Sequence, residues 1–229
     1  LAGNAFTTAS CFALIAGVAL CAAQAAQAQT AGSWSARIGA SQISPSVTSG
    51  DLSPPAFPHT KADVESASQL AGGINYTIDD RWAVDVPLSL PFKHTINGDG
   101  AIAGVGKLGE VKALPFTVLA QYRFGDPGAK FRPYIGAGPT YAKFFKERST
   151  NVLTALTGGT PAQPTTLSIE SKLVPTVQVG ATMMFNDRWF LDAMVAKTWL
   201  KPRTTLSTGQ TLDIKLNPTT VAIAVGYRF

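Results

Sequence analysis

The chain ends in the stretch Val221-Ala222-Ile223-Ala224-Val225-Gly226-Tyr227-Arg228-Phe229, in which large apolar side chains alternate with small or polar ones. Successive side chains of a β-strand point to opposite faces, so this period of two predicts a strand with one apolar face. The final aromatic residue lies on the apolar face. The pattern is too regular in its alternation to indicate a helix, whose apolar residues recur at three- and four-residue spacing.

The same alternation runs back along the chain to about residue 33. It predicts seven further strands, at residues 34–43, 64–78, 82–95, 114–124, 131–145, 173–185 and 189–195. Tight turn signals at 79–81, 125–128 and 186–187 alternate with longer polar segments at 44–63, 96–106, 147–171 and 203–211. Antiparallel pairing then puts every tight turn at one end and every long loop at the other. An even strand count with this asymmetry is typical of outer-membrane barrels.

The position of the charged residues decides between a membrane barrel and a soluble one. If the odd-numbered residues of the last strand face outward, the inward face carries the six charged residues Arg37, Glu65, Asp85, Arg123, Asp192 and Arg228. Ion pairs inside a barrel satisfy one another, whereas a lipid-facing arginine costs about 2–4 kcal/mol at the bilayer midplane. The residues therefore predict an all-β, eight-stranded antiparallel transmembrane β-barrel. A soluble sandwich, or a lipocalin-like barrel with apolar residues inside, is the alternative.

Composition supports a membrane barrel and excludes several other classes. Only 14% of the 229 residues are charged, against roughly 25% in soluble domains. The longest apolar stretch, at residues 12–23, is too short to span a bilayer as a helix, which needs about 18 residues or more. The formal charge of +5 is spread without any basic run, so no nucleic-acid partner is expected.

The first 28 residues differ from the rest in having no charged residue. An apolar core followed by Ala26-Gln27-Ala28 predicts a secretory signal peptide over residues 1–28 and a barrel over residues 29–229; a first core helix is the alternative. Both cysteines, Cys11 and Cys21, lie in this segment, so the mature chain is expected to have no disulfide. The strand that ends at Phe229 then predicts an assembly signal, read at Tyr227 and Phe229 by the outer-membrane barrel-assembly machinery.

Several motifs resemble the OmpW family of small outer-membrane barrels. They include Trp34-Ser35-Ala36-Arg37, Pro91-Phe92-Lys93-His94, residues 114–124, Arg132-Pro133-Tyr134 with the glycines that follow, and the terminal Gly226-Tyr227-Arg228-Phe229. The resemblance covers nearly the whole mature chain except the long loops. It implies an eight-stranded barrel in the bacterial outer membrane, with short periplasmic turns, long extracellular loops and a narrow, partly apolar lumen. It also implies a channel for small hydrophobic molecules.

One group of residues bears on that implied function. Apolar side chains at Leu200, Ile214, Leu216 and Val174 fall on the inward parity of the long-loop half of the barrel. We interpret them as a lumen gate that accepts small apolar solutes. The charged residues further down the lumen stop such a solute from running straight through, so it would leave sideways through the wall. The alternative is that they simply plug the barrel, because eight strands leave an interior just wide enough for side chains.

The remaining motifs do not indicate catalysis. The two histidines, His59 and His94, have no carboxylate at metal or triad spacing. We therefore expect no enzymatic activity, no metal and no cofactor. The expected partners are outer-membrane lipid, the assembly machinery and small apolar solutes, and the expected state is a monomer. Two rival hypotheses are a sealed structural or adhesive barrel, whose loops bind host, phage or envelope partners, and a lipid-modifying outer-membrane enzyme.

Overall fold

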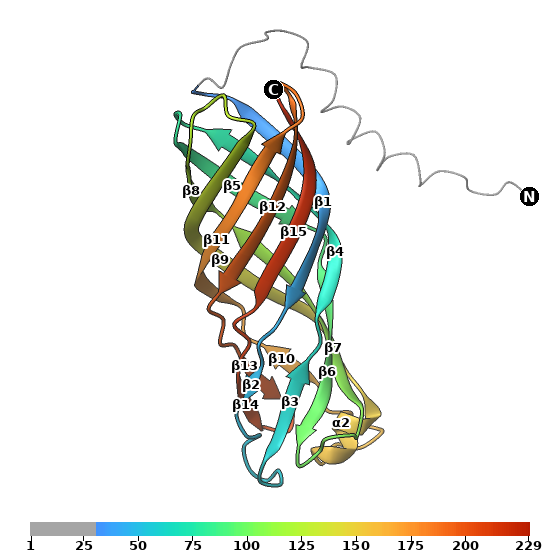
Figure 1. Cartoon of the computed structure of the whole chain (residues 1–229). Helices are drawn as coiled ribbons and strands as arrows, with labels where there is room; N and C mark the ends of the chain where they lie inside the picture. Colours follow the sequence, from blue (N-terminus) through green and yellow to red (C-terminus); the bar gives the residue numbers. More distant parts are fainter. Residues whose placement is uncertain (1–30) are drawn as a thin grey trace, which may run out of the picture.

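The computed structural model describes residues 31–229, and the predicted signal peptide at 1–28 lies outside the described residues. The described chain forms a barrel that continues at one end into a smaller region of short strands (Figure 1). Its elements are β1 (Trp34–Ser44), β2 (Thr48–Ser49), β3 (Thr60–Val64), β4 (Ala67–Thr77), β5 (Trp82–Ser89), β6 (Phe92–Gly100), β7 (Lys107–Thr117), β8 (Leu119–Arg123), β9 (Phe131–Ser149), α2 (Asn151–Leu156), β10 (Leu167–Ile169), β11 (Lys172–Met184), β12 (Trp189–Thr198), β13 (Arg203–Leu206), β14 (Thr211–Lys215) and β15 (Thr219–Arg228).

The barrel wall forms a closed ring, and its strand pairings are antiparallel throughout the described residues. Its order is β11-β12-β15-β1-β4-β5-β8-β9, and pairing of β9 with β11 completes the ring of eight. The predicted fold class is therefore confirmed. The strands at 34–43, 131–145, 173–185, 189–195 and 221–229 are each found as a single strand. Those predicted at 64–78, 82–95 and 114–124 are each broken in two, at residues 65–66, 90–91 and 118.

The apolar faces point outward, as the charge pattern requires. Val221 and Ile223 on β15 are 52% and 55% exposed, whereas Asp85 and Asp192 are 0% and 5% exposed. Aromatic side chains gather at the tight-turn end of the wall, where Trp82 packs edge-on against Tyr122, and Trp189 against Tyr227. Such an aromatic girdle marks a membrane–water interface.

The two ends of the described chain meet in the wall. Strand β15 pairs with β1 from Ser35–Arg228 to Ser44–Thr219. The Phe229 backbone N–H donates to the Trp34 carbonyl at 2.9 Å, at the tight-turn end. Tyr227 and Phe229 are placed there on the outward face, with ring centroids 5.3 Å apart.

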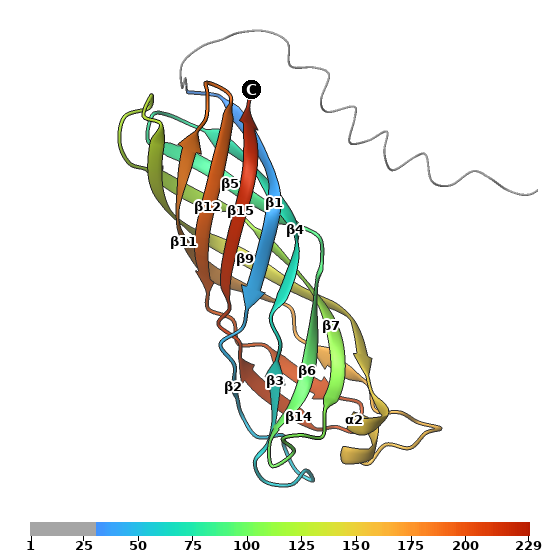
Figure 2. The same ribbon diagram turned by 45° about the vertical axis from the view of Figure 1, so that its right-hand side comes forward.

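The connections at the other end are more ordered than expected. The predicted polar loops contain strands, because β6, β7 and β9 continue beyond the barrel and β10, β13, β14 and β2 form a second sheet (Figure 2). Helix α2 also lies here, with Thr150 as its N-cap. This region has its own buried apolar cluster of Ile102, Leu108, Leu153, Leu167 and Leu206. These apolar residues are too widely spaced in the sequence to show a strand pattern.

No helix among residues 31–229 is long and apolar enough to cross a bilayer.

Candidate functional site

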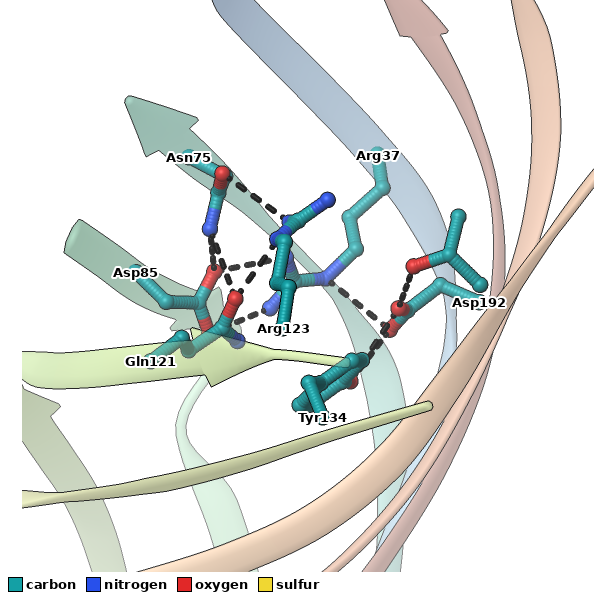
Figure 3. Close-up of polar contacts among 8 residues, drawn as sticks. Arg37, Asn75, Asp85, Gln121, Arg123, Tyr134 and Asp192 are labelled. Atoms are coloured by element: carbon teal, nitrogen blue, oxygen red, sulfur yellow. Dashed lines mark hydrogen bonds and ion pairs between the residues drawn. The ribbon is translucent and has the colours of Figure 1, made fainter. Parts of the chain in front are cut away.

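The tight-turn half of the lumen is filled by a network of ion pairs (Figure 3). Arg37 on β1 binds Asp85 on β5 with both guanidinium nitrogens, at 2.6 and 2.8 Å. Its Nε lies 3.6 Å from an Asp192 carboxylate oxygen on β12. One buried arginine therefore holds two buried carboxylates from different strands.

Uncharged side chains complete this network. The hydroxyl of Tyr134 donates to Asp192 at 3.1 Å, and Asn75 Nδ2 donates to Gln121 Oε1 at 3.0 Å. Arg123 Nη2 donates to Asn75 Oδ1 at 3.1 Å. Figure 3 shows these side chains converging on the barrel axis from opposite sides of the wall. They fill the interior at this level, as is common in eight-stranded barrels.

Sequence reasoning identified only part of the network. The structure brings together Arg37, Asp85, Arg123 and Asp192, as predicted. It does not place Glu65 with them: Glu65 is exposed in the break between β3 and β4, where it accepts a hydrogen bond from Asn97 at 2.7 Å.

Arg228 also lies outside the network. It is the last residue of β15, at the tight-turn end of the barrel, where its Nη2 atom contacts Met184 Sδ at 3.6 Å. The sequence prediction did not include Asn75, Gln121 and Tyr134, because it rested on charged residues alone. Their inward parity was the available signal.

A glycine makes room for the Tyr134 ring. A Cβ atom placed on Gly180 would lie 2.5 Å from both the hydroxyl oxygen and the ring carbon that bears it. Gly180→Ala is therefore expected to displace Tyr134 from Asp192 and to lower the free energy of unfolding by about 1–3 kcal/mol. Denaturant titration in detergent or lipid measures the free energy of unfolding. Gly128→Ala is the control, because a Cβ atom there meets nothing within 4 Å. Equal stability of the two variants would contradict the prediction.

The long-loop half of the lumen is apolar. The predicted gate residues lie together: Leu200, Ile214 and Leu216 are 5–9% exposed in one cluster, and Val174 packs against it. The Leu216 N–H donates to the Leu200 carbonyl at 2.9 Å, which fixes the two side chains next to each other. Phe144 belongs to the same cluster.

Two cavities flank this cluster. The larger has a volume of about 130 Å³ and is lined by Leu200, Leu216, Phe92 and Phe144 among others. The smaller, of about 70 Å³, lies beyond Ile214 under the second sheet. A single water needs about 10–15 Å³ on this scale, so the larger cavity has room for a small organic molecule.

The barrel wall has a window beside the larger cavity. The β5–β8 ladder ends at the pair Asp85–Leu119, and pairing resumes between β6 and β7 at Phe92–Ala113. Between these points no ladder pairing joins residues 86–91 to residues 114–118. Pro87, Pro91 and Pro115 lie in these segments, and proline has no N–H to donate to a ladder. We define the window as the unpaired stretch between residues 86–91 and 114–118.

The window borders the larger cavity. Pro87, Leu88, Leu114 and Pro115 line the cavity as well as the window. The outer rim is apolar, since Leu88, Leu90, Phe116 and Val118 are 49–53% exposed. At the window, the cavity is therefore separated from the outer surface of the wall by apolar side chains without ladder pairing. Sequence reasoning missed this feature, although the three prolines were visible.

Charged side chains lie above the window, outside the membrane-spanning part. Lys93 on β6 binds the Glu110 carboxylate at 2.8 Å, and Lys107 contacts the same group. Hydrogen bonds from Lys107 and Lys93 lower the pKa of Glu110 to about 2. The carboxylate is therefore ionised throughout the physiological pH range.

Among residues 31–229, no three His, Cys, Asp or Glu side chains are grouped so that they would hold a metal ion.

Comparison with known proteins identifies the family. The model of the OmpW family matches residues 30–229. Outer membrane protein W of Vibrio cholerae serotype O1 is 35% identical over 170 residues, which are 72% of this chain and 76% of that protein. The dibenzothiophene metabolism operon protein PahQ of Pseudomonas aeruginosa is 26% identical over 175 residues, 75% of this chain and 76% of that protein.

The fold comparison agrees. The crystal structure of the outer membrane protein OprG from Pseudomonas aeruginosa superposes with a TM-score of 0.78 at 26% identity, covering 89% of this chain and 99% of that one. The chain therefore belongs to the OmpW family, whose barrels lie in the bacterial outer membrane.

Proposed function

We propose that this barrel gives small hydrophobic molecules a passive, non-catalytic route across the outer membrane. The solute enters from the extracellular side between the apolar residues of the second sheet. It then passes Ile214 and Leu216 into the larger cavity and leaves sideways through the window. The observation that carries this proposal is a mostly apolar cavity bordered by a stretch of wall without ladder pairing, at residues 86–91 and 114–118.

The ionic network supports a sideways exit rather than straight passage. Below the cavity, Arg37, Asp85 and Asp192 fill the lumen with charges that an apolar solute cannot displace favourably. The rim of the window, by contrast, faces hydrocarbon. A relative named for dibenzothiophene metabolism also favours an apolar aromatic solute.

Closing the window tests the proposal. The double variant Pro87→Val and Pro115→Val gives both segments an N–H and a residue that favours strands. We expect naphthalene uptake by cells lacking general porins to fall several-fold. Hydrogen exchange at the two new amides reports whether the ladder has closed. Pro133→Val is the control, because Pro133 lies where β9 is already paired with β11. Unchanged uptake with both new amides protected would refute the sideways route.

A further inference from the structure

Four buried threonines form a continuous row of hydroxyl groups across the barrel wall. Their oxygens are 2.8 Å apart between Thr117 and Thr140, 2.6 Å between Thr140 and Thr176, and 2.8 Å between Thr176 and Thr198. Each residue is at most 8% exposed. We call this row the threonine belt. It begins on β7 at the edge of the window and crosses β9 and β11 to β12.

The belt divides the lumen into two chemically different halves. All four threonines line the larger cavity. Along β12 and its continuation, the inward positions pass from Asp192 through Thr198 to Leu200. The belt thus lies between the ionic network and the apolar cluster. A molecule whose apolar part occupies the cluster has this row of hydroxyls at its other end.

A count of protons shows that the belt has spare hydrogen-bonding capacity. Four hydroxyl groups carry four protons, and the three bonds use three of them. One of the four hydroxyls therefore keeps a free proton. It is Thr117 or Thr198 when all three bonds run in one direction, and Thr140 or Thr176 when both end hydroxyls donate inward. Either oxygen of each pair fits as the donor, so the direction of the row can reverse. The belt can donate to a ligand or accept from it.

A buried glutamine in the same cavity wall also lacks partners. Gln178 is 4% exposed and is the next inward residue after Thr176 on β11. Neither its amide nitrogen nor its amide oxygen forms a hydrogen bond within residues 31–229. Leaving a buried amide unsatisfied costs about 1–3 kcal/mol, so a ligand that supplies a polar group beside it gains by doing so.

We propose that the threonine belt and Gln178 form a binding subsite for one uncharged polar group on an otherwise apolar solute. This inference rests on the proposed function and narrows it. The preferred solutes are small molecules with an aromatic or aliphatic body and a single hydroxyl or carbonyl group. An ionised head group is disfavoured, because most of the cavity lining is apolar and would desolvate it, and because Arg37, which also lines the cavity, is already paired with Asp85 and Asp192.

A matched pair of tracers tests the subsite. Naphthalene and 1-naphthol share one ring system and differ by one hydroxyl group. Uptake of each is measured in cells lacking general porins, with the wild-type chain, with no barrel, and with a variant in which all four belt threonines are replaced by valine. All four must be replaced, because Thr140 and Thr176 alone would keep one bond and one spare proton. Replacing all four with serine keeps the hydroxyls and serves as the control. Gel migration without boiling checks folding.

The expected result is selective. The variant with four valines should lower 1-naphthol uptake about five- to tenfold, which corresponds to the loss of about one hydrogen bond, and leave naphthalene uptake unchanged. The variant with four serines should behave as wild type. If the valine variant changes both tracers equally, or neither, the subsite is refuted while the proposed route stands. If wild-type cells take up neither tracer faster than cells without the barrel, the proposed function itself fails.

Discussion

Cells that carry Leu216→Asp are expected to take up naphthalene at least about tenfold more slowly than cells that carry the wild-type chain. Leu216 is 9% exposed and lines the cavity next to Leu200. An ionised carboxylate there either holds water in the path or must be desolvated as the solute passes. Each outcome costs more than the 1.4 kcal/mol that corresponds to a tenfold change in rate. Leu200→Asp is expected to act in the same way.

The matched control is Leu216→Met, which nearly conserves volume and adds no charge. It should retain uptake within about twofold. All variants are first compared by gel migration with and without boiling, because a misfolded barrel would also fail to transport. Folded Leu200→Asp and Leu216→Asp barrels that pass naphthalene at the wild-type rate would show that these residues do not lie on the route.

Arg37→Met is expected to cause the largest loss of stability, about 3–5 kcal/mol, because it leaves two buried carboxylates without their cation. Asp85 is fully buried and Asp192 is 5% exposed, so water cannot replace the guanidinium. Equilibrium unfolding in urea, followed by tryptophan fluorescence in lipid vesicles, measures the loss. The triple variant Arg37→Met, Asp85→Leu and Asp192→Leu should recover much of it, since removing all three charges leaves none unpaired.

An exposed pair of the same chemistry is the control. Arg203 binds Asp213 at 2.8 Å beyond the membrane, where both side chains are more than half exposed. The hydrogen bond from Arg203 lowers the pKa of Asp213, yet water screens this pair. Arg203→Met should therefore change stability far less than Arg37→Met. Equal effects of the two substitutions would mean that the lumen network is hydrated and contributes no more than a surface ion pair.

The barrel was predictable from the sequence because the alternation of residues along each wall strand indicates which face meets lipid and which meets the lumen. Val221, Ile223 and Val225 indicate a face toward lipid, whereas Arg37 and Asp85 on other strands indicate a face toward the lumen. Where a strand is interrupted, the alternation of side chains no longer indicates their direction. Glu65 was assigned to the lumen by this alternation, but β3 ends at Val64 and β4 begins at Ala67, and the Glu65 side chain is exposed.

The window could not be derived from local pattern, because it depends on which strands pair rather than on which residues form strands. Pro87 and Pro115 are 28 positions apart in the sequence, and only the pairing of β5 with β8 and of β7 with β9 brings the two segments to opposite edges of one opening. The threonine belt is similar. Its members are separated by 22 to 36 residues, so only the register of four strands aligns them.

The joining of β1 to β15 has a consequence for biogenesis. Since the wall is sealed by the first and last strands of the described chain, the ring stays open until Phe229 has been synthesised. Until then, both edges carry backbone groups that hydrocarbon cannot solvate. Strand β15 therefore has to reach the membrane before the sheet can close, and a chain that stalls before this strand would remain an open, curved sheet with two unpaired edges.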